Sequence, residues 1–346
     1  MLPETPNRAQ GPATLLDGQV LELFSLVSGS FLNFQKKFKQ RNQVLNGARG
    51  AAWLARSADS PHGRNRKVEG SNPSGPTTQG DTAMSLDAKL QQLKSIIDDC
   101  ESAVIAFSGG VDSSLVCAVA HQVLGDRTIA ATAVSQTYPP SELEVAREIT
   151  KLIGIKHITI TTDELNDSNF TANPPERCYY CKRELLGKLD ELRRKLGFKC
   201  IFDGTNYDDH SDFRPGLRAI KEFKIVSPLA EASLTKEEIR VLAVRYGLPN
   251  ASKPANPCLA SRIPFGQEIT PERLERIARG EEFIRSLGFN VVRVRDHGDR
   301  ARVEVDKEEL PRAWELEEKI VSTLRSFGYP SVVIDSQGYR MGGANL

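Results

Sequence analysis

The chain has 346 residues, of which 39% are hydrophobic and 26% are charged, so it is long enough for two ordinary domains with apolar cores. The 46 Lys and Arg residues balance 45 Asp and Glu residues, and this near neutrality argues against nucleic acid or an anionic membrane as the main partner. The sequence contains no run of about 18 apolar residues, which excludes a transmembrane helix, and its start lacks the pattern of a secretory signal. These features predict a cytoplasmic protein.

Residues 1–83 lack sustained periodicity and end in a stretch rich in Gly, Ser, Pro and Asn, so we expect them to be disordered. The tetrapeptide Gly70–Pro73 would be encoded by GGTTCGAATCC, a string that resembles the T-arm of a transfer RNA gene. This resemblance raises a second hypothesis, namely that the true start is Met84 and that the preceding residues are an extension.

From residue 84 to residue 255 the pattern is regular. Apolar residues at helical spacing over 86–97 precede an apolar run over 103–107, which predicts a buried strand. Strands and helices of about a dozen residues then alternate, with helices predicted over 113–125, 141–154 and 181–197 and strands over 128–134, 156–163 and 200–205. This alternation predicts an α/β domain with a doubly wound parallel sheet, whose ligands bind beyond the carboxyl ends of the strands.

The pattern changes after a Pro-rich turn over 249–264. Residues 256–346 are predicted to form a smaller α+β domain, with helices over 270–288 and 309–328 and strands over 290–297, 301–306 and 331–337.

The segment 108–114 lies between the first predicted strand and the next helix. Gly109 and Gly110 let backbone amides approach an anion, and the helix N-terminus adds a partial positive charge, so Ser108 to Ser113 are predicted to bind phosphate. The segment has neither the Lys of a Walker A loop nor a GxGxxG fingerprint. Asp112 is predicted to hold a magnesium ion that bridges the phosphates. The alternative is an ordinary Gly-rich helix cap.

Three cysteines are candidates for chemistry. Cys178 and Cys181 lie at i and i+3 near a helix start, and Cys258 lies in the loop NPCLASR with Arg262 close by. Three thiolates with one open position fit a [4Fe-4S] cluster, whereas zinc would need a fourth ligand. The alternatives are a redox CxxC pair, or plain helix residues, with a buried loop thiol. The remaining cysteines lie at apolar positions and are expected in the core: Cys100, Cys117 and Cys200.

Charged residues elsewhere suggest contacts with substrate. Arg214, in the loop DDHSDFRPG with Asp208 and Asp209, is expected near the strand ends, unless this is a solvated acidic turn. Arg293 and Arg295 alternate with valines and so share one strand face, where they meet a substrate phosphate or form an exposed polar surface. Glu304, on the next strand, binds a metal or pairs with these arginines.

The motifs together carry a resemblance. SGGVDSS resembles the PP-loop of the ATP pyrophosphatases, which release pyrophosphate while they adenylate a substrate. With RCYYCK, DGTNYDDHSDFRPG, SPLAEA and NPCLASRIPFG in this order, the chain resembles the ATP-dependent sulfur transferases of the LarE family over residues 86–343. The PP-loop resemblance implies that Ser135, at the end of the second strand, lies at the adenine.

The LarE resemblance also implies a reaction. Carboxylates of pyridinium-3,5-biscarboxylic acid mononucleotide are adenylated and become thiocarboxylates, a step in nickel-pincer nucleotide biosynthesis. Some members carry only the cysteine matching Cys258, which gives up its own sulfur, and others hold a cluster with three cysteines. The three cysteines here imply the cluster type, so the expected cofactors are ATP, Mg²⁺ and [4Fe-4S], and the expected partner is sulfide or another sulfur donor. From their positions in the sequence, the residues predicted to contact the substrate are Arg214, Arg262, Arg293 and Arg295. A homo-oligomer is expected.

Three alternatives remain open. A PP-loop enzyme that thiolates a transfer RNA base would also use cysteines, but it normally has a basic surface. A PP-loop synthetase that uses ammonia leaves the three cysteines unexplained. A nucleotide-binding regulator without turnover would release no pyrophosphate.

Overall fold

The computed structural model describes residues 84–211, 215–254, 256–340 and 342–345. All of them belong to one compact unit, Gly80–Leu346. The predictions made for residues 1–83 and for Arg214 concern positions outside these ranges. Among the residues that the structure describes, no helix combines the length and apolar character needed to cross a membrane.

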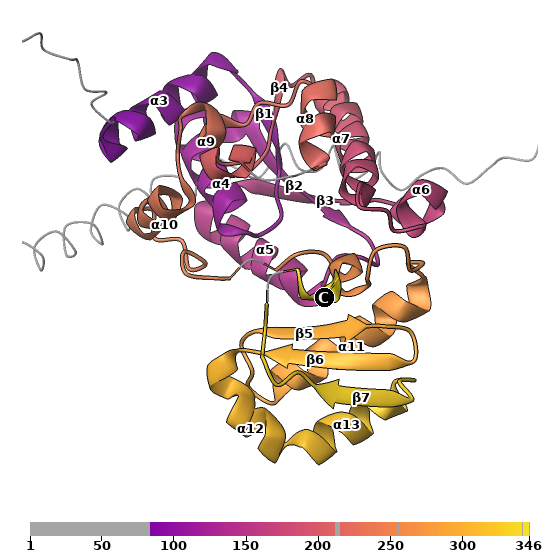
Figure 1. The fold of residues 1–346 in the computed structure, drawn as a ribbon. Helices are drawn as coiled ribbons and strands as arrows, with labels where there is room; N and C mark the ends of the chain where they lie inside the picture. Colours follow the sequence, from indigo (N-terminus) through magenta and orange to yellow (C-terminus); the bar gives the residue numbers. More distant parts are fainter. Residues whose placement is uncertain (1–83, 212–214, 255, 341, 346) are drawn as a thin grey trace, which may run out of the picture. The chain divides into compact units, whose positions relative to one another are not determined.

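A four-stranded parallel sheet forms the first half of the described chain, as the sequence predicts (Figure 1). Its strands lie in the order β3 (Lys156–Thr161), β2 (Thr128–Val134), β1 (Ala103–Ala106) and β4 (Cys200–Phe202). The chain first adds strands on one side of β1 and then returns to the other side. The order therefore reverses between β1 and β4, and this is where sheets of this class bind ligands.

Helices cover both faces of this sheet (Figure 1). The alternation of side chains along β1 sends Ala103 and Ile105 to one face and Val104 to the other. The first face packs against helices α3 (Leu86–Asp99), α4 (Val111–Leu124), α5 (Pro140–Ile153) and α10 (Lys236–Arg245). The second packs against α7 (Arg177–Leu196) and α8 (Gly216–Glu222). The helices predicted in this half of the chain are confirmed, whereas α8, α10 and the short α6 (Ser168–Thr171) and α9 (Pro228–Glu231) were not predicted.

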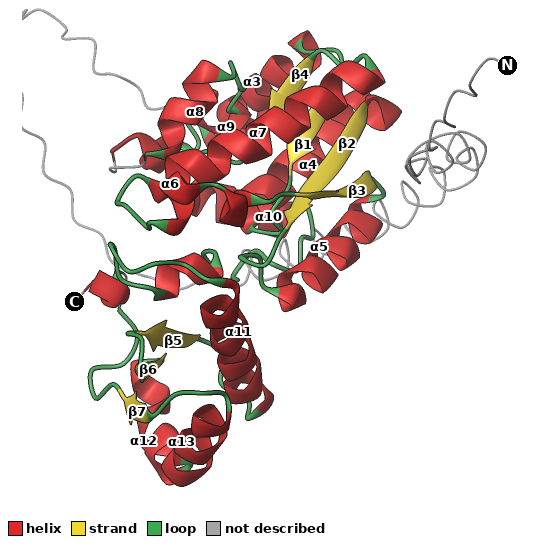
Figure 2. Cartoon of the chain, turned by 90° about the vertical axis from the view of Figure 1, so that its right-hand side faces the viewer, coloured by secondary structure: helices red, strands yellow, loops and turns green. Residues whose placement is uncertain are grey.

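A mixed three-stranded sheet follows, in the order β5 (Val292–Asp296), β6 (Arg300–Val305) and β7 (Ser331–Ile334). Its apolar face packs against α11 (Pro271–Ser286), α12 (Leu310–Glu315) and α13 (Glu317–Ser326) (Figure 2). The prediction of a single helix over 309–328 is wrong. The chain leaves the helical conformation at Leu316, where φ is −102° and ψ is 10°, and so forms α12 and α13 instead. No Gly or Pro marks this break in the sequence.

A small apolar cluster surrounds the loop of Cys258. Phe170 from α6 packs with Leu259, Ala260 and Ile263 of that loop and with residues of α11, and Cys181 and Cys258 contact the edge of the cluster. This packing ties the loop to both α7 and α11.

Candidate active site

The phosphate loop connects β1 to α4. Gly109 has a φ of +76°, a conformation that residues with a side chain rarely adopt, and Gly110 caps α4 without using a side chain. The Ser108 and Ser113 hydroxyls lie 3.2 Å apart across the loop. Buried Asn250 donates to Gly109 O and to Ser114 Oγ, both at 2.9 Å. These contacts fix the turn between β1 and α4.

Gly204 follows β4, the strand next to β1, and its backbone packs against Ser113 of the phosphate loop. A Cβ atom at this position would lie 2.9 Å from Ser113 N and 3.3 Å from Ser113 Cα. Only a residue without a side chain fits there, because real Cβ atoms do not approach backbone so closely. No role for Gly204 was predicted from the sequence.

Asp112, the predicted magnesium ligand, forms an ion pair with Lys236 at the start of α10. Its other oxygen accepts a 3.4 Å hydrogen bond from Asn206. Lys236 was missed because the helix that positions it was not predicted, although the Thr235 and Glu238 capping box is visible in the sequence.

One cavity of about 380 Å³ extends from the phosphate loop to two of the candidate cysteines. Ser108, Asp112 and Ser113 line one part of it, and Cys181 and Cys258 line another. Its other walls include Ala131, Ala133, Ser135, Thr137, Glu164, Lys182, Leu185 and Asp203. A nucleotide bound at the loop would therefore share one space with two of the three candidate cysteines.

The three cysteines approach one another closely enough to interact electrostatically. Burial raises the pKa of the Cys181 thiol well above its usual range, and negative charge on Cys258, Glu164 and Cys178 raises it further. Cys178 remains exposed and does not line the cavity. Partial burial raises the pKa of the Cys178 thiol most, and the charge of Cys258 raises it further, whereas the charge of Arg177 lowers it.

The donor set fits a cluster held by three thiolates, because Cys178 and Cys181 are one helical turn apart in α7, and Cys258 lines the same cavity as Cys181. Within the described ranges, however, no three His, Cys, Asp or Glu side chains are already grouped as a metal site. Binding a cluster would therefore require these side chains to turn toward it.

Arg262 has a different environment from the one expected of a substrate contact. Its side chain is completely buried and bonds both oxygens of Glu281 in α11, at 2.7 and 2.9 Å. Its remaining donors reach Pro257 O at 2.6 Å, Cys258 O at 3.2 Å and other groups of the same loop. Direct binding of substrate by Arg262 stays a prediction, whereas the contacts seen make it the residue that shapes the Cys258 loop.

Arg293 and Arg295 lie on the face of the small sheet opposite its apolar core. Both are 4% exposed, so the alternative of an exposed strand face is wrong. Arg295 pairs with buried Glu304 at 2.8 Å and donates to Ser261 O at 3.2 Å. Burial and the nearby charge of Arg262 lower the pKa of Arg293 to about 10. Pairing of Glu304 is confirmed, and a phosphate contact for the arginines remains a prediction.

The acidic turn after β4 is partly structural. Asp208 accepts a 2.7 Å hydrogen bond from the backbone of Lys236, and so caps the start of α10. Asp209, which is 8% exposed, lines the cavity and accepts a bond from Asn206 N at 3.0 Å.

Ser135 lines the cavity, but its hydroxyl donates to Glu164 Oε1 at 2.5 Å. Thr137 donates to the same oxygen at 2.5 Å. Glu164 is 3% exposed and was not singled out from the sequence, because a glutamate in a turn after a strand carries no special signal.

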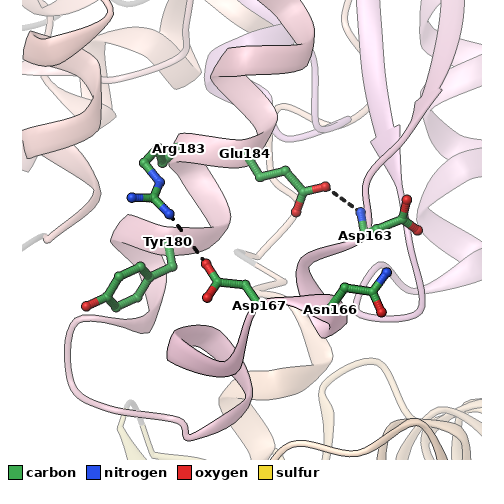
Figure 3. A pocket seen from close by; sticks show the side chains of 6 residues that line it. All are labelled: Asp163, Asn166, Asp167, Tyr180, Arg183 and Glu184. Atoms are coloured by element: carbon green, nitrogen blue, oxygen red, sulfur yellow. Dashed lines mark hydrogen bonds and ion pairs between the residues drawn. The ribbon is translucent and has the colours of Figure 1, made fainter.

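A second pocket, shown in Figure 3, shares no lining residue with this cavity. Asp163, Asn166, Asp167, Tyr180, Arg183 and Glu184 line it. Neighbours along α7 thus face different pockets, since Cys181 and Lys182 face the cavity with the phosphate loop.

A phosphate loop without a Walker lysine, placed after the first strand of a parallel sheet, defines a PP-loop ATP pyrophosphatase. In agreement, residues 99–174 match the family model of asparagine synthase. The chain is 44% identical over 262 residues to the uncharacterized protein slr1717 of Synechocystis, covering 75% of this chain and 98% of that protein.

The chain is also 33% identical to the pyridinium-3,5-bisthiocarboxylic acid mononucleotide synthase of Lactiplantibacillus plantarum, covering 75% of this chain and 95% of the synthase. A glutamine-hydrolyzing GMP synthase polypeptide of Archaeoglobus fulgidus is 29% identical over 53% of this chain and 63% of its own length. The chain therefore belongs to the LarE family, and it is an ATP-dependent enzyme that transfers sulfur.

Proposed function

We propose that the protein converts carboxylates of pyridinium-3,5-biscarboxylic acid mononucleotide into thiocarboxylates, as a cytoplasmic step in nickel-pincer nucleotide biosynthesis. One observation carries the proposal: Ser108, Asp112 and Ser113 line the same cavity as Cys181 and Cys258. The similarity to the synthase from Lactiplantibacillus plantarum supports the choice of substrate. A homo-oligomer and a domain boundary at residues 255–256 accompany this proposal as predictions.

Activation of the carboxylate comes first. A substrate carboxylate oxygen attacks the α-phosphorus of ATP, the bond from that phosphorus to the bridging oxygen breaks, and pyrophosphate leaves. The amides of the phosphate loop and the N-terminus of α4 bind the departing phosphates. Asp112 would hold magnesium there, and Lys236, which pairs with Asp112 in this structure, would then turn its charge to the phosphates.

Sulfur delivery follows. In the first of two routes, the Cys258 thiolate attacks the acyl carbon, a carbon–sulfur bond forms, and AMP leaves with its oxygen. Loss of the Cα proton of Cys258 to a base and cleavage of its Cβ–Sγ bond then release the thiocarboxylate and leave dehydroalanine. Alternatively, Cys178, Cys181 and Cys258 would hold a [4Fe-4S] cluster, which supplies an iron open to an additional sulfide. In that case Cys258 is a ligand and survives turnover.

The test uses Cys258→Ala, with Cys200→Ala as control because Cys200 is a half-buried thiol at the start of β4, outside the cavity. Pyrophosphate release with the pyridinium dicarboxylate nucleotide and the mass of the product are measured anaerobically. We expect Cys258→Ala to bind ATP and release pyrophosphate but to form no thiocarboxylate, while the control does both. Thiocarboxylate formed by Cys258→Ala would refute the role of this residue.

The mass of wild-type protein after turnover distinguishes the two sulfur sources. A loss equal to H₂S identifies Cys258 as the donor. An unchanged protein that contains iron and sulfide and turns over repeatedly identifies the cluster. Absence of pyrophosphate release with this nucleotide in the wild type would refute the proposed function itself.

A further inference from the structure

Glu164 has a buried carboxylate, and one of its two oxygens has no hydrogen-bond partner. Oε1 accepts hydrogen bonds from Ser135 and Thr137, both at 2.5 Å, whereas Oε2 is buried without a hydrogen-bond partner. Its side chain is 3% exposed and lines the cavity that the phosphate loop and the cysteines share. Burying a charged oxygen without a partner is costly, so such an atom points to a ligand that the cavity receives.

Two contacts with α7 fix the chain on either side of Glu164, at Asp163 and at Asp167 (Figure 3). Glu184 of α7 accepts a 2.5 Å hydrogen bond from the backbone of Asp163, and Arg183 pairs with Asp167 at 3.5 Å. With Ser135 and Thr137 fixing Oε1, these contacts leave the direction of Oε2 little freedom. The contacts around the second pocket therefore fix the backbone of the segment that carries Glu164.

Glu164 lies on the sulfur side of the cavity. Thr137, which donates to it, also accepts a 2.9 Å hydrogen bond from Leu259 N, next to Cys258. Cys181 and Cys258 line the same cavity as Glu164. A group bound against Oε2 would therefore lie in the part of the cavity next to the Cys258 loop.

The described residues give Glu164 no cation. Lys182, the nearest lysine in the cavity wall, is paired with Asp203 at 3.0 Å, and Arg177 donates to Asn173 at 2.5 Å. The two donors to Glu164 are neutral hydroxyls. A carboxylate in this setting favours a ligand with positive charge, because attraction is strong where water is excluded.

We infer that Glu164 recognises the permanent positive charge of the pyridinium ring in the acceptor nucleotide, and so makes the enzyme selective for a cationic ring over a neutral one. This inference rests on the proposed function, whose acceptor is a pyridinium. Glu164 is then a specificity residue that contacts substrate, and the Ser135 hydroxyl serves to orient it rather than to bind adenine.

The test compares binding of two nucleotides in the presence of an ATP analogue that cannot be cleaved between its α- and β-phosphates. One is pyridinium-3,5-biscarboxylic acid mononucleotide. The other has a neutral 3,5-dicarboxyphenyl ring in place of the pyridinium. The variants are Glu164→Gln, which keeps size and hydrogen bonding, and Glu164→Asp, which keeps the charge. Asp163→Asn is the matched control, since Asp163 is an exposed carboxylate one residue away that faces the second pocket.

We expect the wild type and Asp163→Asn to prefer the pyridinium nucleotide by on the order of tenfold or more, Glu164→Gln to lose this preference, and Glu164→Asp to keep part of it. Affinity for the ATP analogue should not change in any variant. If the wild type binds both nucleotides equally well, the inference is overturned, and no measurement on the variants is needed. It would also be overturned by a Glu164→Gln variant that retains the preference, or that loses affinity for the ATP analogue instead. A wild type that binds neither nucleotide refutes the proposed function and is thereby distinguished from these results.

Discussion

Substitution of Gly204 by alanine tests the geometry of the phosphate loop. The new Cβ atom would lie 2.9 Å from Ser113 N, and relief to an ordinary contact requires the loop backbone to move by roughly 0.5 Å. Gly204 does not have a positive φ, so alanine meets no conformational strain of its own and the effect is steric.

A shift of this size lengthens an amide–phosphate hydrogen bond from about 2.9 Å to about 3.4 Å, beyond the normal range. Since misplacement of a reacting group by about 1 Å can cost a factor of 10², we expect pyrophosphate release to fall on the order of tenfold. The overpacking should also lower the free energy of unfolding by about 1–3 kcal/mol.

The assay is substrate-dependent pyrophosphate release, with thermal unfolding measured in parallel. Gly187→Ala in α7 is the control, because a Cβ atom there meets nothing within 4 Å and alanine favours a helix by up to about 1 kcal/mol. We expect this control to be active and at least as stable as the wild type. Wild-type pyrophosphate release by Gly204→Ala would refute the assignment of Ser113 and its neighbours to the phosphates.

Three other contacts lead to measurable expectations. Lys236→Met should raise the KM for ATP on the order of tenfold in pyrophosphate assays, and an unchanged KM would exclude Lys236 from the phosphates. Burial alone would raise the pKa of Asp296, but hydrogen bonds from Arg276 and the charge of Arg273 hold it below its usual 3.8. Its stabilising contribution is therefore present above about pH 4 and lost as the pH falls below that value, and Asp296→Asn should flatten the acid side of a stability–pH curve. Anaerobically purified wild type should contain iron and sulfide, and Cys181→Ser much less; equal contents would exclude Cys181 as a ligand.

The sheet and the phosphate loop could be predicted from the sequence because local signals determine them. The run Ala103–Ala106 is apolar throughout, as a strand buried on both faces must be, and the glycines at 109 and 110 mark the turn directly. The cysteine motif likewise predicted a helix start, which the structure places at Arg177.

The contacts of charged side chains could not be predicted, because partners far apart in sequence determine them. Arg262 has the appearance of a loop cation until Glu281, 19 residues later, is placed beside it. Asp112 and Lys236 are 124 residues apart, and their pairing depends on a helix whose amphipathic pattern is short. Glu164 differs from any glutamate in a turn only through burial, which no local pattern reports.

The bonds of Arg262 have a consequence for the order in which activity arises. Its guanidinium joins the backbone of the Cys258 loop to Glu281, so the loop acquires these bonds only after α11 has folded against it. During synthesis on the ribosome, the residues that contact the phosphate loop are complete before α11 is made. At that stage the Cys258 loop still lacks its partner Glu281. The Cys258 loop thus needs residues that follow it in the chain, whereas the described contacts of the phosphate loop need none of them.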